Sequence, residues 1–427
     1  MTKLVIKNVE LINHGPQYPK MNIAITGNKI TAISAGPIPG FADAEVIDGS
    51  GKLAVPGMIN AHTHAAMTLL RSYADDMALM DWLNKMIWPA EANLDGDAIY
   101  WGSQLAILEM LKSGTTAFAD MYFFMDETAR VVEETGFRAS LSRGLIGNAP
   151  DAAAKLAENV ELFQNWNNKA DGRIKVMLGP HAPYTCNPDF LKKVKQEADK
   201  LGSASHMHLS EPEQEVKDCV QAYGKTPIEF ADSFGFLENG LLAAHCVHVT
   251  PAEIKLMAAK KVRVVHNPQS NLKLASGFAP VPQMLQANIC VALGTDGASS
   301  NNNLDMLEEC RMAAMIHKGF SGDPLAVPAK TALDMATENG ALAIGFDHLG
   351  KLEPGYLADI VLYDMHKPYW YPRHDRLSLF VYAANSADAD TVIINGKVLL
   401  QQGRALYMDE EKIYAESERC GKHLIAK

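Results

Sequence analysis

Several histidines and one aspartate occur at spacings that suit a divalent metal ion. His62 and His64 are separated by one residue, so on an extended strand both imidazoles point to the same face. His208, His245 and Asp296 follow much later, each at the end of a short strand-like run. Neutral imidazoles with a carboxylate suit a borderline cation such as Zn²⁺, and a site that keeps a water is catalytic. The pattern therefore predicts a catalytic metal site.

A place in the core is the alternative interpretation of each histidine. For any single histidine a core role is at least as good an explanation as a metal ligand, because histidines in proteins are of intermediate burial. For the whole set it is weaker, because unpaired polar groups at four matching strand ends would be costly inside a barrel. The joint pattern favours the metal site.

The segments that must position these residues alternate between short apolar runs and longer stretches of helical period. Such alternation is typical of βαβ units and a parallel sheet. Eight strands are expected, ending near His64, Asp120, Arg143, His181, His208, His245, His266 and Asp296. Eight units over about 295 residues fit an α/β fold of the (β/α)8 TIM barrel type, with its active site at the C-terminal strand ends. A doubly wound sheet is the alternative, but its Gly-rich phosphate turn is missing.

Both ends of the chain have a different sequence pattern, in which short segments of alternating apolar and polar residues are interrupted by Gly, Pro and Asn. Asn395-Gly396 lies between two apolar runs, which is a strong hairpin signal. We therefore expect residues 1–56 and 353–427 to form one small β-sandwich domain, and residues 57–352 to form the barrel.

Composition excludes several classes of protein. Lys and Arg total 39 against 50 Asp and Glu, a net charge of −11, and no basic run is present to bind nucleic acid. The first residues lack the pattern of a signal peptide, and no apolar stretch approaches the ~18 residues of a membrane helix. The 6 cysteines are scattered without a C-x-x-C pair. We expect a cytoplasmic protein with reduced thiols and no membrane partner.

Together, these motifs resemble the amidohydrolase superfamily. The match covers nearly the whole chain: His62-Thr-His64, His208-Leu-Ser-Glu211, Ala244-His245-Cys, His266-Asn-Pro, Gly294-Thr-Asp296-Gly and Gly350-Lys-Leu-Glu-Pro-Gly. Within the superfamily the chain is most similar to the deaminases acting on 5′-methylthioadenosine and S-adenosylhomocysteine, a branch that also holds triazine chlorohydrolases. The resemblance implies a barrel enzyme that hydrolyses a ring substituent.

The resemblance also implies a set of metal ligands. His62, His64, His208 and Asp296 are expected to bind one Zn²⁺ per chain, with Fe²⁺ or Mn²⁺ as alternatives. Many relatives hold two metals bridged by a carbamylated lysine at the end of strand four. Here that strand ends in histidine and Lys175 stands too early, so we expect a mononuclear site.

Three residues receive catalytic roles from the same resemblance. Asp296 is expected to take the proton of the attacking water, and His245 to orient that water and support charge on the attacked carbon. Glu211 is expected to contact the substrate, protonate the ring nitrogen and pass a proton to the departing ammonia. The alternative for Glu211 is a solvated carboxylate at a helix start.

The nucleoside contacts are carried over in the same way. Trp82 is expected to supply an apolar wall, Glu91 to bind both ribose hydroxyls, and His181 to contact the nucleoside. Arg143 matches an arginine associated with the carboxylate of S-adenosylhomocysteine. A second family arginine is missing, since a lysine stands near residue 155. This departure favours methylthioadenosine or adenosine as substrate.

We therefore expect a zinc-dependent hydrolytic deaminase that converts 5′-substituted adenosines to inosine analogues and ammonia. One alternative is a ring deaminase or chlorohydrolase acting on guanine, cytosine or a chlorotriazine. Another is an inactive relative serving as a scaffold, against which the complete ligand set speaks. The expected partner is a small nucleoside, and a homo-oligomer is compatible with the chain although no residue specifies one.

Overall fold

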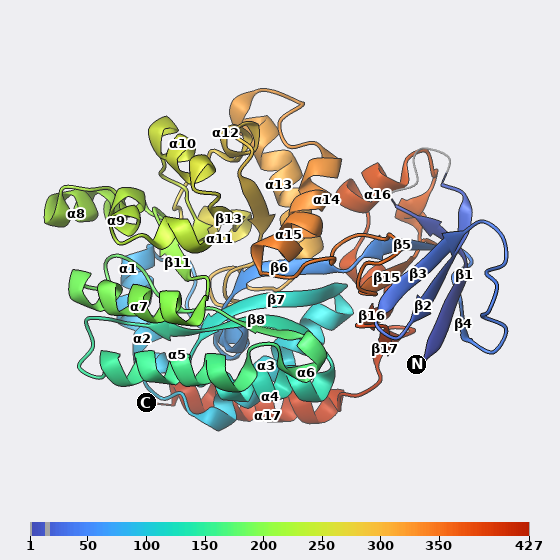
Figure 1. The fold of residues 1–427 in the computed structure, drawn as a ribbon, viewed down its shortest axis with the longest axis horizontal. Helices are drawn as coiled ribbons and strands as arrows, with labels where there is room; N and C mark the ends of the chain where they lie inside the picture. The colour runs from blue at the N-terminus through green and yellow to red at the C-terminus, as the bar shows by residue number, and fades with distance from the viewer. Residues whose placement is uncertain (1, 13–17, 427) are drawn as a thin grey trace.

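The computed structural model describes residues 2–12 and 18–426. Figure 1 shows a sheet built around the N-terminal strands at one end of the molecule and a larger part in which helices surround central strands. The chain is thus of mixed α/β type, as expected.

Parallel strands form the centre of the larger part. They make two sheets, with the orders β10-β8-β7-β6, where β9 also pairs with β8, and β11-β12-β13-β14. Their bounds are β6 Met58–Thr63, β7 Thr115–Tyr122, β8 Arg138–Leu145, β9 Ile174–Val176, β10 Gly179–Pro180, β11 His206–Leu209, β12 Leu242–His245, β13 Arg263–His266 and β14 Cys290–Leu293. The predicted strands are confirmed in their positions and parallel order.

Backbone hydrogen bonds join the two parallel sheets along both pairs of edges. His208 N donates to His181 O at 2.9 Å between β11 and the end of β10. Asp296 N donates to His62 O at 3.0 Å, which ties the residues after β14 to β6. The C-terminal ends of all these strands therefore lie at one end of the structure, where side chains from distant parts of the sequence meet.

Helices and short turns separate the strands along the chain. Their bounds are η1 Ala65–Leu70, α1 Leu79–Trp82, η2 Leu83–Ile87, α2 Trp88–Glu91, α3 Gly96–Lys112, α4 Met125–Thr135, α5 Ala152–Trp166, α6 Lys169–Gly172, α7 Pro188–Leu201, α8 Glu213–Tyr223, α9 Pro227–Ser233, η3 Phe236–Asn239, α10 Pro251–Ala259, α11 Pro268–Lys273, α12 Val281–Gln286, α13 Met306–Ser321, α14 Ala329–Ala336 and α15 Glu338–Ala343. Polar caps fix several starts: Asn187 accepts from Phe190 N at 3.0 Å, and Thr226 and Thr250 form capping boxes.

Strands from both ends of the chain build the second part. One sheet has the order β18-β17-β16-β15-β5-β1-β2-β3, with β4 pairing β1. Its strands are β1 Lys3–Leu11, β2 Lys20–Thr26, β3 Lys29–Ser34, β4 Glu45–Asp48, β5 Lys52–Pro56, β15 Ile360–Asp364, β16 Ala389–Ile394, β17 Lys397–Gln401 and β18 Arg404–Ala405. Val55 pairs with Val361, which joins the two chain ends. The Asn395-Gly396 hairpin is confirmed, with φ of 53° and 76° at its two turn residues.

Ion pairs and hydrogen bonds between side chains hold the two parts of the chain together. Arg138 at the start of β8 forms a buried ion pair with Asp359 just before β15, with Nε 2.9 Å from Oδ2. The remaining C-terminal elements are η4 Pro368–Trp370, α16 Arg376–Tyr382, η5 Ser386–Asp388 and α17 Glu410–Ile425. Helix α17 returns to the larger part, where Ser417 Oγ donates to Trp101 O of α3 at 3.2 Å.

The described residues also show the state of the cysteines and the character of the helices. Each of the 6 cysteines is free, so no disulfide links them. The described helices include none that is both long and apolar enough to cross a bilayer.

Candidate metal and active site

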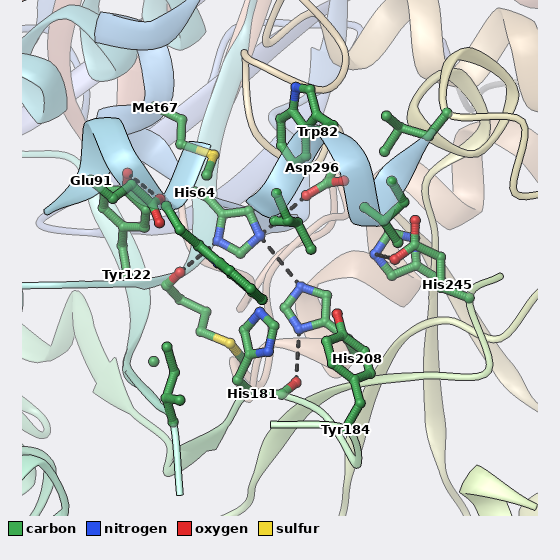
Figure 2. Close-up of a pocket in the computed structure, with 18 of the residues that line it drawn as sticks. His64, Met67, Trp82, Glu91, Tyr122, His181, Tyr184, His208, His245 and Asp296 are labelled. Carbon is green, nitrogen blue, oxygen red and sulfur yellow. Dashed lines mark hydrogen bonds and ion pairs between the residues drawn. The ribbon is translucent and has the colours of Figure 1, made fainter. Parts of the chain in front are cut away.

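A cavity opens at the C-terminal ends of the parallel strands (Figure 2). It contains about 660 Å³ of space outside the protein atoms. Polar groups from the strand ends line its floor: His64, His181, His208, Glu211, His245 and Asp296. The segment between β6 and α3 covers it with Leu79, Trp82, Leu83, Trp88 and Glu91. The floor is therefore polar and the cover largely apolar.

The four predicted metal ligands lie close together. Asp296 Oδ1 is 3.2 Å from His64 Nε2 and 3.4 Å from His62 Nε2, and His208 Nε2 is 3.4 Å from His64 Nε2. Ligands at about 2.0–2.1 Å from a tetrahedral zinc lie ~3.3 Å apart, so these separations fit such an ion. His62 Nε2 is also fully buried without a hydrogen-bond partner. A buried nitrogen with a free lone pair is what a cation would satisfy.

The outer nitrogens of these histidines are held by fixed partners. His208 Nδ1 donates to His181 O at 2.9 Å, and His64 Nδ1 donates to Met121 O at 2.6 Å. A carbonyl only accepts, so each ring keeps its Nε2 turned to the other predicted ligands.

His62 reaches a carbonyl through a chain of hydrogen bonds. Ser142 Oγ donates to Asp120 O at 3.0 Å, so it accepts from His206 Nδ1 at 3.4 Å. His206 Nε2 is then an acceptor, and it receives the Nδ1 proton of His62 at 2.8 Å. This direction leaves the lone pair of His62 on Nε2, facing Asp296.

Charges in the site follow from burial and from one carboxylate. Burial lowers the pKa of His62 to about 4 and that of His208 well below its usual range, so both rings are neutral at pH 7. Burial also opposes protonation of His64, but the hydrogen bond and charge of Asp296 outweigh it and raise the pKa to about 9. His64 is therefore protonated beside the ionised Asp296, and a metal ion bound there would replace that proton.

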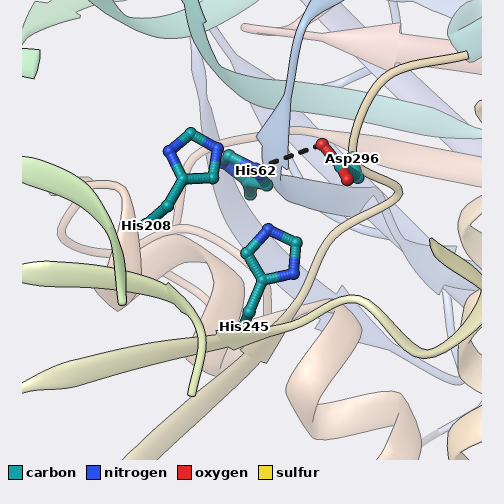
Figure 3. Close-up of side chains that lie close together, drawn as sticks. All are labelled: His62, His208, His245 and Asp296. Atoms are coloured by element: carbon teal, nitrogen blue, oxygen red, sulfur yellow. Dashed lines mark ion pairs between the residues drawn. The ribbon is translucent and has the colours of Figure 1, made fainter. Parts of the chain in front are cut away.

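A second grouping exchanges one histidine. The ligand atoms of His62, His208, His245 and Asp296 all lie within 4.8 Å of one another (Figure 3). His245, however, directs Nδ1 to Asn271 Oδ1 at 2.9 Å and Nε2 to Glu211 Oε2 at 3.7 Å. The set with His64 includes separations of 3.2 to 3.4 Å, and His245 lies beside it with its Nε2 directed to Glu211.

Glu211 is buried beside His245 and is held from two sides. Ser276 Oγ donates to its Oε1 at 3.1 Å, and burial raises the pKa of its carboxyl. The carboxylate of Glu215 accepts from Ser210 N at 3.1 Å and from Glu211 N at 2.8 Å. Because Ser210 has φ of +54°, these two bonds stabilise an uncommon backbone conformation directly before Glu211.

Asp296 is likewise fixed in orientation. Its Oδ2 accepts from Ser270 Oγ at 2.6 Å and from Ser300 Oγ at 2.9 Å, and its Oδ1 accepts from Gly297 N at 2.9 Å. Sequence reasoning missed Ser270 and Ser300, as it missed Ser142 and Glu215. Ser270 and Ser142 act by contacts that only the fold creates, whereas Ser300 and Glu215 stand four residues after Asp296 and Glu211, a local spacing that could have found them.

The predicted nucleoside contacts are only partly brought together. Trp82, Glu91 and His181 line the cavity with Glu211. Tyr122 Oη donates to Glu91 Oε1 at 2.7 Å, and burial raises the pKa of Glu91 to about 7. Arg143 is absent from the described lining of this cavity and pairs with a residue of α5 instead.

Parallel strands that deliver buried histidines and an aspartate to one covered cavity define a metal-dependent hydrolase of the α/β class. The amidohydrolase family profile matches residues 53–399, and the chain belongs to that family. This confirms the resemblance found in the motifs.

Relatives of named activity cover almost the full chain. The 5-methylthioadenosine/S-adenosylhomocysteine deaminase of Pelotomaculum thermopropionicum is 50% identical over 100% of this chain and 99% of its own. A solved adenosine deaminase from Xanthomonas campestris with bound zinc is 36% identical, covers 100% of this chain and 99% of its own, and has a TM-score of 0.94. A zinc-containing atrazine chlorohydrolase from Arthrobacter aurescens is 26% identical, covers 98% and 100%, and has a TM-score of 0.90.

Proposed function

We propose that this protein is a zinc-dependent hydrolytic deaminase of adenosine-type nucleosides, with 5′-methylthioadenosine and S-adenosylhomocysteine as the substrate class of its relatives. One observation carries the proposal: the tight His/Asp group and the buried Glu211 share a cavity with a half-buried carboxylate, Glu91. The His/Asp group and Glu211 suit removal of a ring amine, and Glu91 suits binding of the ribose hydroxyls.

The residues present fit one zinc ion per chain. His62, His64, His208 and Asp296 would hold it, a set supported by their separations and by the unpartnered Nε2 of His62. When bound, zinc supplies Lewis acidity that lowers the pKa of water from 15.7 to about 7. Lys175 donates to Asn168 Oδ1 at 2.6 Å, so it is engaged away from the site, which supports a single metal.

The protein residues divide the proton transfers of the reaction. A bond forms between the water oxygen and C6 of adenine, and the bond from C6 to the exocyclic nitrogen breaks, releasing ammonia. Asp296 accepts the proton of the water, and His245 orients the water by its Nε2, which lies 3.7 Å from Glu211 Oε2. Glu211, whose pKa is raised by burial, protonates N1, then takes the proton of the new hydroxyl on C6 and passes it to the leaving nitrogen; the proton held by Asp296 restores Glu211 afterwards.

The remaining contacts orient the nucleoside. Glu91 accepts the ribose hydroxyls with the oxygen that Tyr122 leaves free. Trp82 donates a hydrogen bond from its Nε1 to Ala74 O at 3.1 Å and forms an apolar wall of the cavity. His181, which also lines the cavity, contacts the nucleoside. In these roles the reacting carbon faces the His/Asp group, and the ribose is bound by Glu91 of the covering segment.

We also propose the finer architecture that the strand connections support. The two parallel sheets form a closed (β/α)8 barrel over residues 57–352, and residues 1–56 with 353–427 form a β-sandwich domain. The hydrogen bonds between β10 and β11 and between β6 and Asp296 support closure of the barrel.

A substrate panel tests the activity. The zinc-loaded protein should convert 5′-methylthioadenosine to its inosine analogue, with loss of the adenine absorbance band. Glu211→Gln should abolish turnover at unchanged zinc content, which separates catalysis from metal binding. Faster turnover of free adenine, guanine or a chlorotriazine than of any nucleoside would refute the proposed activity. A metal analysis that finds two equivalents of zinc per chain would refute the mononuclear site.

A further inference from the structure

Helix α11 and the turn that follows it carry polar side chains that reach the proton-transfer groups of the site: Ser270, Asn271 and Ser276. Ser270 Oγ donates to Asp296 Oδ2 at 2.6 Å, and Ser276 Oγ donates to Glu211 Oε1 at 3.1 Å. The amide of Asn271, between the two serines, is directed to the ring of His245. One short segment thus touches all three groups.

The side chain of Asn271 has a defined place beside this ring. Asn271 and His245 are each only 1% exposed. The backbone of Asn271 is held on both sides, because its N donates to Asn267 O at 3.0 Å and its O accepts from Ser276 N at 2.8 Å. Asn271 Oδ1 lies 2.9 Å from His245 Nδ1, the separation of an ordinary hydrogen bond.

The position of the proton on His245 follows from what faces its two ring nitrogens. An amide oxygen only accepts, so the contact with Asn271 Oδ1 needs a proton on Nδ1. Asn267 Nδ2, a donor, approaches the same nitrogen at the longer distance of 3.3 Å. Nε2 lies 3.7 Å from Glu211 Oε2, beyond hydrogen-bond distance. A neutral ring holds one proton, so the shorter contact places it on Nδ1 and leaves the lone pair on Nε2.

The other half of the Asn271 amide argues against a role in packing alone. Its Nδ2 is buried without a hydrogen-bond partner among the described residues. A buried donor without a partner destabilises a fold, whereas an apolar side chain of similar size carries no such cost. An asparagine at this place therefore lowers stability, as is common for residues that serve a reaction.

We infer that Asn271 is a positioning residue that holds the proton of His245 on Nδ1, so that Nε2 is left as a hydrogen-bond acceptor on the side of Glu211. The inference rests on the proposed deaminase function. It adds which nitrogen of His245 carries the proton and which residue decides this.

An acceptor at Nε2 completes the orientation of the attacking water. Of the two protons of this water, Asp296 takes one, and the Nε2 lone pair of His245 accepts a hydrogen bond from the other. An electron pair of the water oxygen then remains for the bond to C6. A proton on Nε2 would instead donate to that oxygen and engage the electrons that must attack the ring.

Kinetics of two variants test this role with zinc-loaded protein and 5′-methylthioadenosine. In Asn271→Leu we expect kcat to fall by ~10-fold or more, the scale of one lost hydrogen bond, while KM and zinc content stay within about twofold of the wild type. Its Tm should be unchanged or higher, because the unpartnered amide is gone. Asn271→Asp still offers an oxygen to Nδ1 and should recover most of kcat.

The ring ¹⁵N resonances of His245 report the proton without turnover. They are recorded on zinc-loaded protein labelled with ¹⁵N-histidine and assigned by their loss in His245→Asn. We expect a protonated Nδ1 and a bare Nε2 in the wild type and in Asn271→Asp. In Asn271→Leu this preference should be lost.

Gln269→Leu is the matched control, because Gln269 lies on the same helix and its Nε2 contacts Glu308 at 3.4 Å instead of the site. It should leave kcat and the resonances unchanged. A proton on Nε2 in the wild type would assign the contact at Nδ1 to Asn267, which overturns the inference and leaves the deaminase function standing. Wild-type kcat in Asn271→Leu, or equal losses of kcat in the Leu and Asp variants, would overturn it too. If no nucleoside is deaminated, the proposed function itself fails, and the role of Asn271 in the reaction falls with it.

Discussion

The hydrogen-bond chain behind His62 makes a sharp prediction about metal affinity. In His206→Leu the Nδ1 proton of His62 loses its acceptor at 2.8 Å, and no water replaces it because both rings are 0% exposed. Loss of such a partner behind a metal-binding histidine typically costs 10–100-fold in affinity, or about 1.4–2.7 kcal/mol. Ser142→Ala acts one bond further away, across 3.4 Å, so we expect a smaller loss of less than ~10-fold.

The assay is titration of the metal-free protein with zinc against a chromogenic chelator at pH 7.5, with thermal unfolding of the same samples. His206→Gln is the matched control, because its amide oxygen still accepts the His62 proton, and it should recover most of the affinity. Wild-type affinity in His206→Leu would refute the reasoning. Equal losses in the Leu and Gln variants would refute it too, because they would assign His206 a packing role only.

Three further predictions concern carboxylates of the site. Asp296→Asn should lower both zinc occupancy and rate, and full activity in this variant would contradict its double role. Glu215→Gln should lower kcat by ~10-fold at unchanged zinc content, since one of its two bonds to the backbone before Glu211 is lost; a changed zinc content would show a different role. Glu91→Gln should raise KM for nucleosides selectively. It should also raise Tm at pH 8 by about 2–4 °C, because the pKa of this carboxyl is raised from 4.5 to about 7 in the fold, so the wild type loses stability as the pH rises between those values; the gain should vanish toward pH 4.5, and a gain that persists there would contradict this cause.

Much of the fold could be predicted because the strand ends carry the chemistry. Short apolar runs ending in His208, His245 and Asp296 mark both a strand and its functional end, so one pattern located the parallel strands and their common edge. The covering segment was harder to predict. Its methionines and tryptophans suit a buried helix face equally well, and only the fold shows that Trp82 and Glu91 face the cavity.

Arg143 shows where a residue carried over from relatives needs the structure. Its position at the end of β8 matched the motif, but the direction of its side chain depends on what α5 presents to it. Glu158 lies 15 positions later and pairs with it at 3.0 Å, a contact that no pattern within β8 signals. A motif therefore identified Arg143, while the direction of its side chain depends on Glu158, a partner that the motif does not contain.

The sequence did not predict how the functional groups are aimed. Ser210, His245 and Asp296 all have positive φ, with values of 54°, 72° and 61°, so the chain turns sharply where three strands deliver their functional groups. A left-handed residue other than glycine costs roughly 1–2 kcal/mol, and it persists only where neighbouring contacts hold it. Glu215 holds the first turn through two backbone amides, and Gly297 N caps the carboxylate at the third. Composition and spacing predict which groups reach the site, but their aim depends on backbone turns held by such hydrogen bonds.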